Sequence, residues 1–216
     1  MKLVIMTKPT FFVEEDKILT PLFEEGMDDL HLYKPQSTPM YSERLLSLLP
    51  ENYYRKITVH DHYYLKNEYG LGKIHIDSPS EQLPYDYKGK YSRTCTELSQ
   101  IKDFKKKSEY LFLKCNFQDN PDIRTCDGLS LKELESASSN GFIDKRIYAY
   151  GETNLDNIKI AKELGFGGVV ICNDLWNRFD IHKEIDYKRL MAHFEKLHKA
   201  TSLSLIHISE PTRLRC

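Results

Sequence analysis

Residues 146–171 read RIYAYGETNLDNIKIAKELGFGGVVI and contain one complete repeat of the pattern that organises this chain. An apolar run at Ile147–Ala149 leads to Gly151, an amphipathic stretch follows, and a second apolar run occupies Gly168–Ile171. Apolar β-type runs that alternate with helical stretches predict strand–helix–strand units with parallel strands. We therefore expect an α/β fold.

Comparable apolar runs recur along the rest of the chain. Before the two runs above come Leu3–Met6, Leu30–Leu32, Ile57–Val59, Ile74–Ile76, Lys90–Ser92 and Tyr110–Leu113. Eight strand–helix units in one short chain are what a closed (β/α)8 barrel requires.

The alternative is an open flavodoxin-like or Rossmann sheet. Such a sheet needs a glycine-rich turn after an early strand to bind a nucleotide phosphate. Neither GxGxxG nor GxxxxGKS/T occurs in the sequence. We therefore favour a single-domain (β/α)8 (TIM) barrel over residues 1–202. Such barrels place their chemistry at the carboxyl ends of the strands.

Composition excludes several classes of protein. The chain has 31 basic and 32 acidic residues, so no excess charge favours nucleic acid or an anionic membrane. No apolar run approaches the roughly 20 residues that cross a bilayer, and residues 1–7 lack the features of a signal peptide. None of the five cysteines forms a CxxC pair, so no cysteine zinc site is predicted. We expect a cytoplasmic protein.

The C-terminal segment is set apart from this pattern. Residues 203–213 read LSLIHISEPTR, which looks like the translation of a transposon-end sequencing adaptor. We therefore exclude residues 203–216 from the reasoning on fold and function. The expectation is that this tail packs poorly against the barrel.

Three candidate side chains lie at the end of the second predicted strand: His31, Tyr33 and Lys34. Side chains two residues apart on a strand share a face, so His31 and Tyr33 are both expected to point into the barrel mouth. Lys34 is either a ligand for phosphate or pyrophosphate, or a solvated loop lysine.

The third predicted strand ends in the polar triplet His60-Asp61-His62. Asp61 could coordinate magnesium, which prefers carboxylate oxygens, or it could cap the next helix. His60 and His62 could form half of a metal site, or they could be surface histidines. The residues alone leave both alternatives open.

Gly151 and Asn173 follow the last two predicted strands. Barrels often hold a phosphate between these loops and a short extra helix, which we expect around Leu175–Asn177. Glu152 and Asp174 bring negative charge to this place, so an anion fits only if both acids turn outward. The alternative is that Gly151 has no ligand role and is needed because its turn requires a positive φ, which glycine adopts readily.

Segments spread over almost all of residues 1–179 carry a family resemblance. They are Pro9–Phe12, Leu22–Gly26, Leu30–Pro35, Tyr41–Leu45, Ile74–Ile76, Gly165–Val170 and Asn173–Asn177. On these segments the chain resembles the thiamine phosphate synthase/TenI family of (β/α)8 barrels, in the divergent form found in Bacteroidetes. The family enzyme joins a hydroxymethylpyrimidine pyrophosphate to a thiazole phosphate and releases pyrophosphate.

The resemblance implies a small phosphorylated substrate and a Mg²⁺ ion that neutralises the leaving group. TenI-type relatives instead move a proton on the thiazole, where a histidine can serve as base. A third reading is a barrel without transfer chemistry that binds a phosphorylated or thiazole-like ligand, or a partner protein. A homodimer is the oligomer to test for.

Residue by residue, the family motifs map unevenly onto this chain. Of the triplet after the third strand, Asp61 matches the family's magnesium aspartate, and Asp77 is the nearest substitute for the second one. In the pyrophosphate loop after the sixth strand, only Phe117 matches. The implied bases are His31 and His60, and the implied substrate-binding residues are His31, Tyr33, Lys34, Ser92, Lys114, Gly151 and Asn173.

Overall fold

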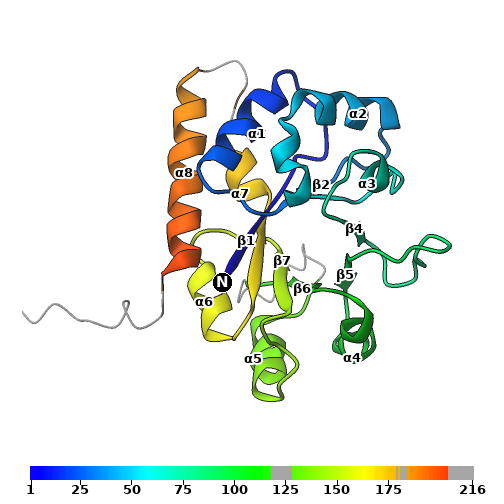
Figure 1. Ribbon diagram of the computed structural model, residues 1–216. Coiled ribbons are helices and arrows are strands. Elements are labelled where there is room, and N and C mark those ends of the chain that lie inside the picture. The colour runs from blue at the N-terminus through cyan, green and yellow to red at the C-terminus, as the bar shows by residue number, and fades with distance from the viewer. Residues whose placement is uncertain (118–127, 179, 181–183, 204–216) are drawn as a thin grey trace, which may run out of the picture.

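The computed structural model describes residues 1–117, 128–178, 180 and 184–203. Within these ranges, eight parallel strands close into a barrel in which β8 pairs with β1 (Figure 1). The strands are β1 (Lys2–Met6), β2 (Leu30–Leu32), β3 (Ile57–Val59), β4 (Lys73–Ile76), β5 (Tyr91–Cys95), β6 (Leu111–Cys115), β7 (Ile147–Gly151) and β8 (Gly168–Ile171). The predicted single-domain (β/α)8 barrel is confirmed.

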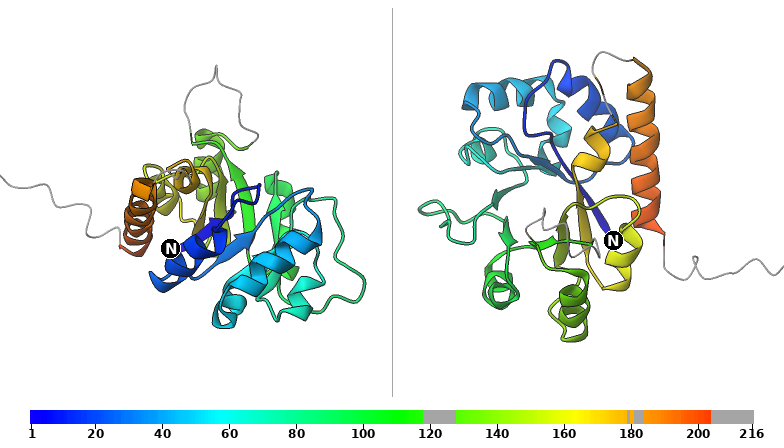
Figure 2. Two further views of the ribbon diagram at one scale, coloured as in Figure 1. Left: turned by 90° about the horizontal axis from the view of Figure 1, so that it is seen from above. Right: turned by 180° about the vertical axis from the view of Figure 1, so that it is seen from behind.

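Helices cover the outside of the barrel. They are α1 (Glu15–Glu24), α2 (Pro39–Leu48), α3 (Leu65–Glu68), α4 (Leu98–Lys107), α5 (Leu131–Ser139), α6 (Ile158–Glu163), α7 (Asn173–Trp176) and α8 (Glu184–Ser202), with a 3₁₀ helix η1 (Glu51–Lys56) before β3. The long α8 packs against α1, α6, α7 and β1, along one side of the barrel (Figures 1 and 2). None of the described helices is both long and apolar enough to cross a membrane.

Side-chain alternation divides the core into two parts. On β2, Leu30 and Leu32 join the large cluster between sheet and helices, whereas His31 points inward and contacts the ring of Phe112. The apolar part of the barrel interior is small and consists of Val4, Met6, Tyr110, Phe112, Tyr148 and Val170. In barrels of this type the interior is usually filled by branched apolar side chains. Here imidazole rings take part of that space.

Local signals explain several helix starts. Ser130 and Glu133 form a capping box at the start of α5: the Glu133 carboxylate accepts from the Ser130 amide at 2.8 Å. Asn is a favoured helix N-cap, but Asn154 does not cap α6, which begins only at Ile158. The Asn154 side chain instead accepts from the amides of Asp156 and Asn157, and these bonds stabilise the turn that precedes α6.

The fifth strand is longer than its sequence suggests. It runs from Tyr91 to Cys95 rather than ending at Ser92, and all its residues are buried. Polar side chains on both faces of β5 have hydrogen-bond partners. Thr94 points inward and bonds to His75, whereas Arg93 points outward and donates to the carbonyls of Pro79 and Glu81. Those two carbonyls belong to the β4–β5 connection, which projects from the barrel in both views (Figure 2).

The last described helix, α8, ends at Ser202, and the domain boundary expected after residue 202 stays a prediction. Residues 204–216 lie outside the described part of the chain. The expectation that this tail packs poorly therefore stays a prediction.

Candidate functional site

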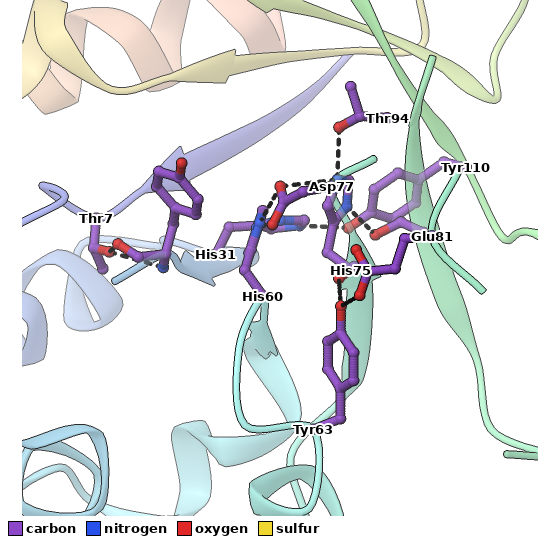
Figure 3. Close-up of polar contacts among 11 residues, drawn as sticks. Thr7, His31, His60, Tyr63, His75, Asp77, Glu81, Thr94 and Tyr110 are labelled. Atoms are coloured by element: carbon purple, nitrogen blue, oxygen red, sulfur yellow. Dashed lines mark hydrogen bonds and ion pairs between the residues drawn. The ribbon is translucent and has the colours of Figure 1, made fainter. Parts of the chain in front are cut away.

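Three histidines lie together inside the barrel, as Figure 3 shows: His31 on β2, His60 directly after β3, and His75 on β4. Each occupies an inward position of its strand, and all three are buried. One ring nitrogen from each lies within 4.8 Å of the others. Three neighbouring strands thus bring three imidazoles to one point.

His60 and His31 belong to a continuous chain of hydrogen bonds. Nδ1 of His60 lies 2.8 Å from Oδ1 of Asp77, and its Nε2 lies 2.8 Å from Nδ1 of His31. Nε2 of His31 lies 2.7 Å from the hydroxyl of Tyr110, which donates to Asp29 at 3.1 Å. Asp77 follows β4 at the carboxyl end of the barrel, and Asp29 precedes β2 at the amino end. The chain therefore links the two ends.

The third histidine is held by hydroxyl groups. His75 lies 2.7 Å from Ser92 Oγ through Nδ1 and 2.8 Å from Thr94 Oγ1 through Nε2. Ser92, a predicted substrate-binding residue, is fully buried and therefore supports His75 beneath the mouth. Burial lowers the pKa of both His31 and His75 well below 6.5, and the nearby His60 lowers it further. Both rings are therefore neutral at physiological pH.

The amino end of the barrel carries its own polar group. Asp29 accepts from Lys73 and from Thr58, both at 3.4 Å, and Lys73 also lies 3.8 Å from Glu109. A cavity of about 880 Å³ opens here, and its lining includes Asp29, Lys73, Glu109, Tyr110 and Lys145. This cavity is at the end opposite the strand termini where barrel chemistry is usual.

Lys34 does not point into the mouth. Its ammonium group is buried against Glu15, 2.6 and 2.8 Å from the two carboxylate oxygens, and it donates to the carbonyls of Lys8 and Thr10. It also lies 4.5 Å from the centre of the Phe11 ring. Burial raises the pKa of Glu15 to about 7, against the opposing effect of Lys34. The structure therefore shows a buried structural ion pair rather than a solvated lysine.

Two acidic residues stand at the mouth on neighbouring strand ends. Asp61 follows β3 and Asp77 follows β4, and both charges raise the pKa of the Tyr33 hydroxyl in addition to its burial. Oδ2 of Asp61 is buried and has no hydrogen-bond partner among the described residues. A buried unpaired carboxylate oxygen is costly. Asp61 and Asp77 therefore fit a hard cation such as Mg²⁺, which binds through one or two carboxylates.

The remaining predicted residues lie around the mouth. Lys114 shares the inward face of β6 with Phe112, and Gly151 ends β7 with a φ of 133°. A Cβ at Gly151 would lie 2.5 Å from the Cys115 carbonyl oxygen, so a side chain is excluded there. Asn173 begins α7.

Asp174 turns away from the mouth. Its carboxylate lies 2.7 Å from Nε2 of His193 on α8 and 3.1 Å from Arg178. An anion near Asn173 was expected to fit only if Glu152 and Asp174 both turn outward, and Asp174 does so. The short helix expected around Leu175–Asn177 is α7, one to two residues earlier than predicted.

Sequence reasoning missed His75, Tyr110 and Asp29, and named Asp77 only as a substitute ligand. Residues 73–77 read KIHID, in which Lys73, His75 and Asp77 alternate with isoleucine. That period of two places all three on the inward face of one strand. The signal was present, but a strand with polar residues inward is atypical of a barrel core.

Comparison with known proteins identifies close structural relatives. Thiamine phosphate pyrophosphorylase from Bacteroides thetaiotaomicron is 44% identical, covers 94% of this chain and 99% of its own, and superposes with a TM-score of 0.83. Thiamine phosphate pyrophosphorylase from Pyrococcus furiosus is 16% identical, with 93% and 95% covered and a TM-score of 0.69, which shows the shared fold. No protein-family model matches the chain, and no curated protein sequence matches it. On the identity and coverage of the Bacteroides relative, this chain belongs to the thiamine phosphate synthase/TenI family.

Proposed function

We propose that this protein joins a hydroxymethylpyrimidine pyrophosphate to a thiazole phosphate at the carboxyl end of its barrel. The bond between the pyrimidine methylene and the pyrophosphate oxygen breaks, the thiazole nitrogen bonds to the methylene, and pyrophosphate leaves with the electron pair. Besides family membership, the observation that carries the proposal is the buried, unpaired carboxylate oxygen of Asp61 at the mouth.

Charge on the leaving pyrophosphate has to be neutralised in this reaction. Lys34 is engaged by Glu15, so among the predicted site residues Lys114 supplies the cationic side chain at the mouth. Asp61 and Asp77 would hold the Mg²⁺ ion, which when bound supplies further positive charge next to the phosphates. Tyr33 and Tyr150 line the interior beside them, with raised pKa values due mainly to burial, so they stay protonated and can donate hydrogen bonds.

The first test is synthesis by the full chain. Protein incubated with both substrates and Mg²⁺ should form thiamine phosphate, measured by its conversion to a fluorescent derivative. Asp61→Asn should lower the rate by about 100-fold or more, the range for loss of one preorganised charge-stabilising group. Asp28→Asn is the matched control, because this aspartate lies at the amino end of the barrel and its side chain is 65% exposed.

Failure of synthesis separates the alternatives. If no thiamine phosphate forms but thiazole phosphate binds in calorimetry, the transfer reaction is wrong and the protein is a binding barrel or a tautomerase. If neither compound binds, every thiamine-linked function is wrong. Circular dichroism of each variant shows whether its fold is intact.

Proton transfer on the thiazole is the second candidate, favoured by the pairing of His60 with Asp77. Carboxylate–imidazole pairs are common in general base catalysis. His60 is only 2% exposed, whereas the Asp77 side chain is 40% exposed, so Asp77 would be the group that meets the substrate. This candidate predicts solvent-deuterium exchange into the thiazole that is lost in Asp77→Asn.

A further inference from the structure

With both histidines neutral, the hydrogen-bonded chain through the barrel has fewer protons than contacts. Its five groups, Asp77, His60, His31, Tyr110 and Asp29, make four contacts of 2.7 to 3.1 Å. A neutral imidazole carries one ring proton, a phenol carries one, and a carboxylate carries none. The two histidines and Tyr110 therefore bring three protons to four contacts.

The two ends of the chain are Asp77 and Asp29, which act as the acceptors of its outer contacts. Asp29 accepts from Lys73 and Thr58 in addition to Tyr110, although its burial raises the pKa of its carboxyl group. Asp77 lies at the mouth with its side chain 40% exposed, and its Oδ1 lies 2.8 Å from Nδ1 of His60. Where both aspartates act only as acceptors, neither end supplies a fourth proton.

Satisfying the outer contacts leaves the central one without a proton. Nδ1–H of His60 donates to Asp77, Nε2–H of His31 donates to Tyr110, and Tyr110 donates to Asp29. Nε2 of His60 and Nδ1 of His31 then face each other at 2.8 Å, each with a lone pair. Two buried lone pairs at this distance repel, and either a proton or a metal ion between the two rings relieves that repulsion.

His75 supplies a third nitrogen next to this contact. One of its ring nitrogens lies within 4.8 Å of the ligand nitrogens of His31 and His60. We propose that His31 Nδ1, His60 Nε2 and a ring nitrogen of His75 bind a divalent transition-metal ion, with zinc as the expected occupant, in the interior of the barrel.

The surroundings match a histidine–metal site. Metal-bound histidines usually donate their other N–H to a carboxylate or another oxygen, which fixes the tautomer. His60 has Asp77 for this purpose, His31 has Tyr110, and His75 has Ser92 through Nδ1. Neutral imidazole nitrogens suit zinc, cobalt or nickel rather than magnesium, so this site differs from the carboxylate site at Asp61.

Metal binding requires a small rearrangement. With Zn–N bonds of about 2.0–2.1 Å in a tetrahedral geometry, neighbouring ligand nitrogens lie about 3.3 Å apart. The 2.8 Å contact has to open slightly, and the ring of His75, now stacked on His60 with centroids 4.4 Å apart, has to tilt. That tilt releases Thr94 from Nε2 of His75 while the bond to Ser92 remains.

The test measures metal, not activity, and does not depend on the proposed transfer reaction. The full chain, stripped with a chelator and then dialysed against Zn²⁺, should retain about one ion per chain by mass spectrometry. Co²⁺ should give the visible absorption of a tetrahedral nitrogen-bound ion. X-ray absorption of the zinc form should show nitrogen neighbours at about 2.0–2.1 Å.

Matched variants locate the ion. His75→Asn should abolish both the retained zinc and the Co²⁺ absorption, whereas His62→Asn and Asp61→Asn should keep both, because neither side chain belongs to the cluster. If His75→Asn does not fold, the X-ray absorption of wild-type protein still decides between nitrogen ligands and others. No retained metal in wild-type protein, or metal that survives in folded His75→Asn, would overturn the proposal. Nitrogen NMR would then show a doubly protonated histidine at the central contact.

Discussion

His31, His60 and His75 place three imidazole rings inside the barrel, where protonation of a single ring would introduce a buried charge. Neither His31 nor His75 can take up a proton without a buried charge, because both rings are fully enclosed. Their hydrogen bonds to Tyr110, Ser92 and Thr94 satisfy the neutral rings only. At the scale of single residues, hydrogen bonds made by the appropriate imidazole tautomers, rather than ion pairs, stabilise the polar interior.

We expect the free energy of unfolding to fall as the pH drops below about 6.5. The folded pKa values of His31 and His75 lie well below 6.5, so the unfolded chain binds protons first as the pH falls. Their contribution is complete above pH 6.5 and is lost toward the folded pKa values, by about 1.4 kcal/mol per pH unit for each histidine. Urea unfolding with a chelator present, from pH 7.5 down to 5, measures it. A flat profile would contradict the assignment of neutral rings.

Gly151 is a second residue whose identity is required. Gly151→Ala should cost about 1–3 kcal/mol, because the backbone has a φ of 133° and the new Cβ would lie 2.5 Å from the Cys115 carbonyl oxygen. Gly141→Ala is the control, since its φ of 73° is also positive but no atom lies within 4 Å of the added Cβ. Thermal unfolding of both variants checks this, and equal losses would show that steric contact at Gly151 is unimportant.

At the scale of elements, ion pairs and caps connect the barrel to its helices. The pair of Lys34 and Glu15 joins the end of β2 to the start of α1, and Asp174 with His193 joins the end of β8 to α8. Both pairs carry polar side chains outward at strand ends: Lys34 had been expected either to bind phosphate or to be solvated, and Asp174 to place negative charge near an anion unless it turns outward. These residues orient the loops around the mouth instead.

Breaking the Lys34–Glu15 pair from one side should be strongly destabilising. Lys34→Met leaves the Glu15 carboxylate buried and unpaired, which costs about 3–5 kcal/mol. The double variant Lys34→Met/Glu15→Leu should recover most of that loss, because no charge remains buried. Lys17→Met removes the exposed partner of Glu14 and should leave stability unchanged. If Lys34→Met unfolds like wild type in urea, the pair is not structural.

At the scale of the whole molecule, strand positions follow from local patterns, and the partners of inward side chains do not. The eight apolar runs lie within or overlap the observed strands, since a short β-type run between amphipathic stretches has few alternatives in a parallel barrel. The polar fifth strand was underestimated because the hydroxyls of Ser92 and Thr94 bond to His75, which lies on another strand.

In the candidate site too, the sequence predicts which side chains point inward but not which partners they contact. Inward positions of His31, Tyr33 and His60 follow from the period of two along each strand. The contact between His31 and Tyr110 does not, because these residues are 79 positions apart and meet only through closure and stagger of the barrel.

Sequence alone determined the parallel barrel, its family resemblance and the shared inward face of His31 and Tyr33, because these depend on patterns along the chain itself. Tertiary structure alone decided that Lys34 binds Glu15 and that His31, His60 and His75 converge. The physical reason is that ring closure sets which inward side chains oppose one another, and that burial then selects the partner able to satisfy each polar atom.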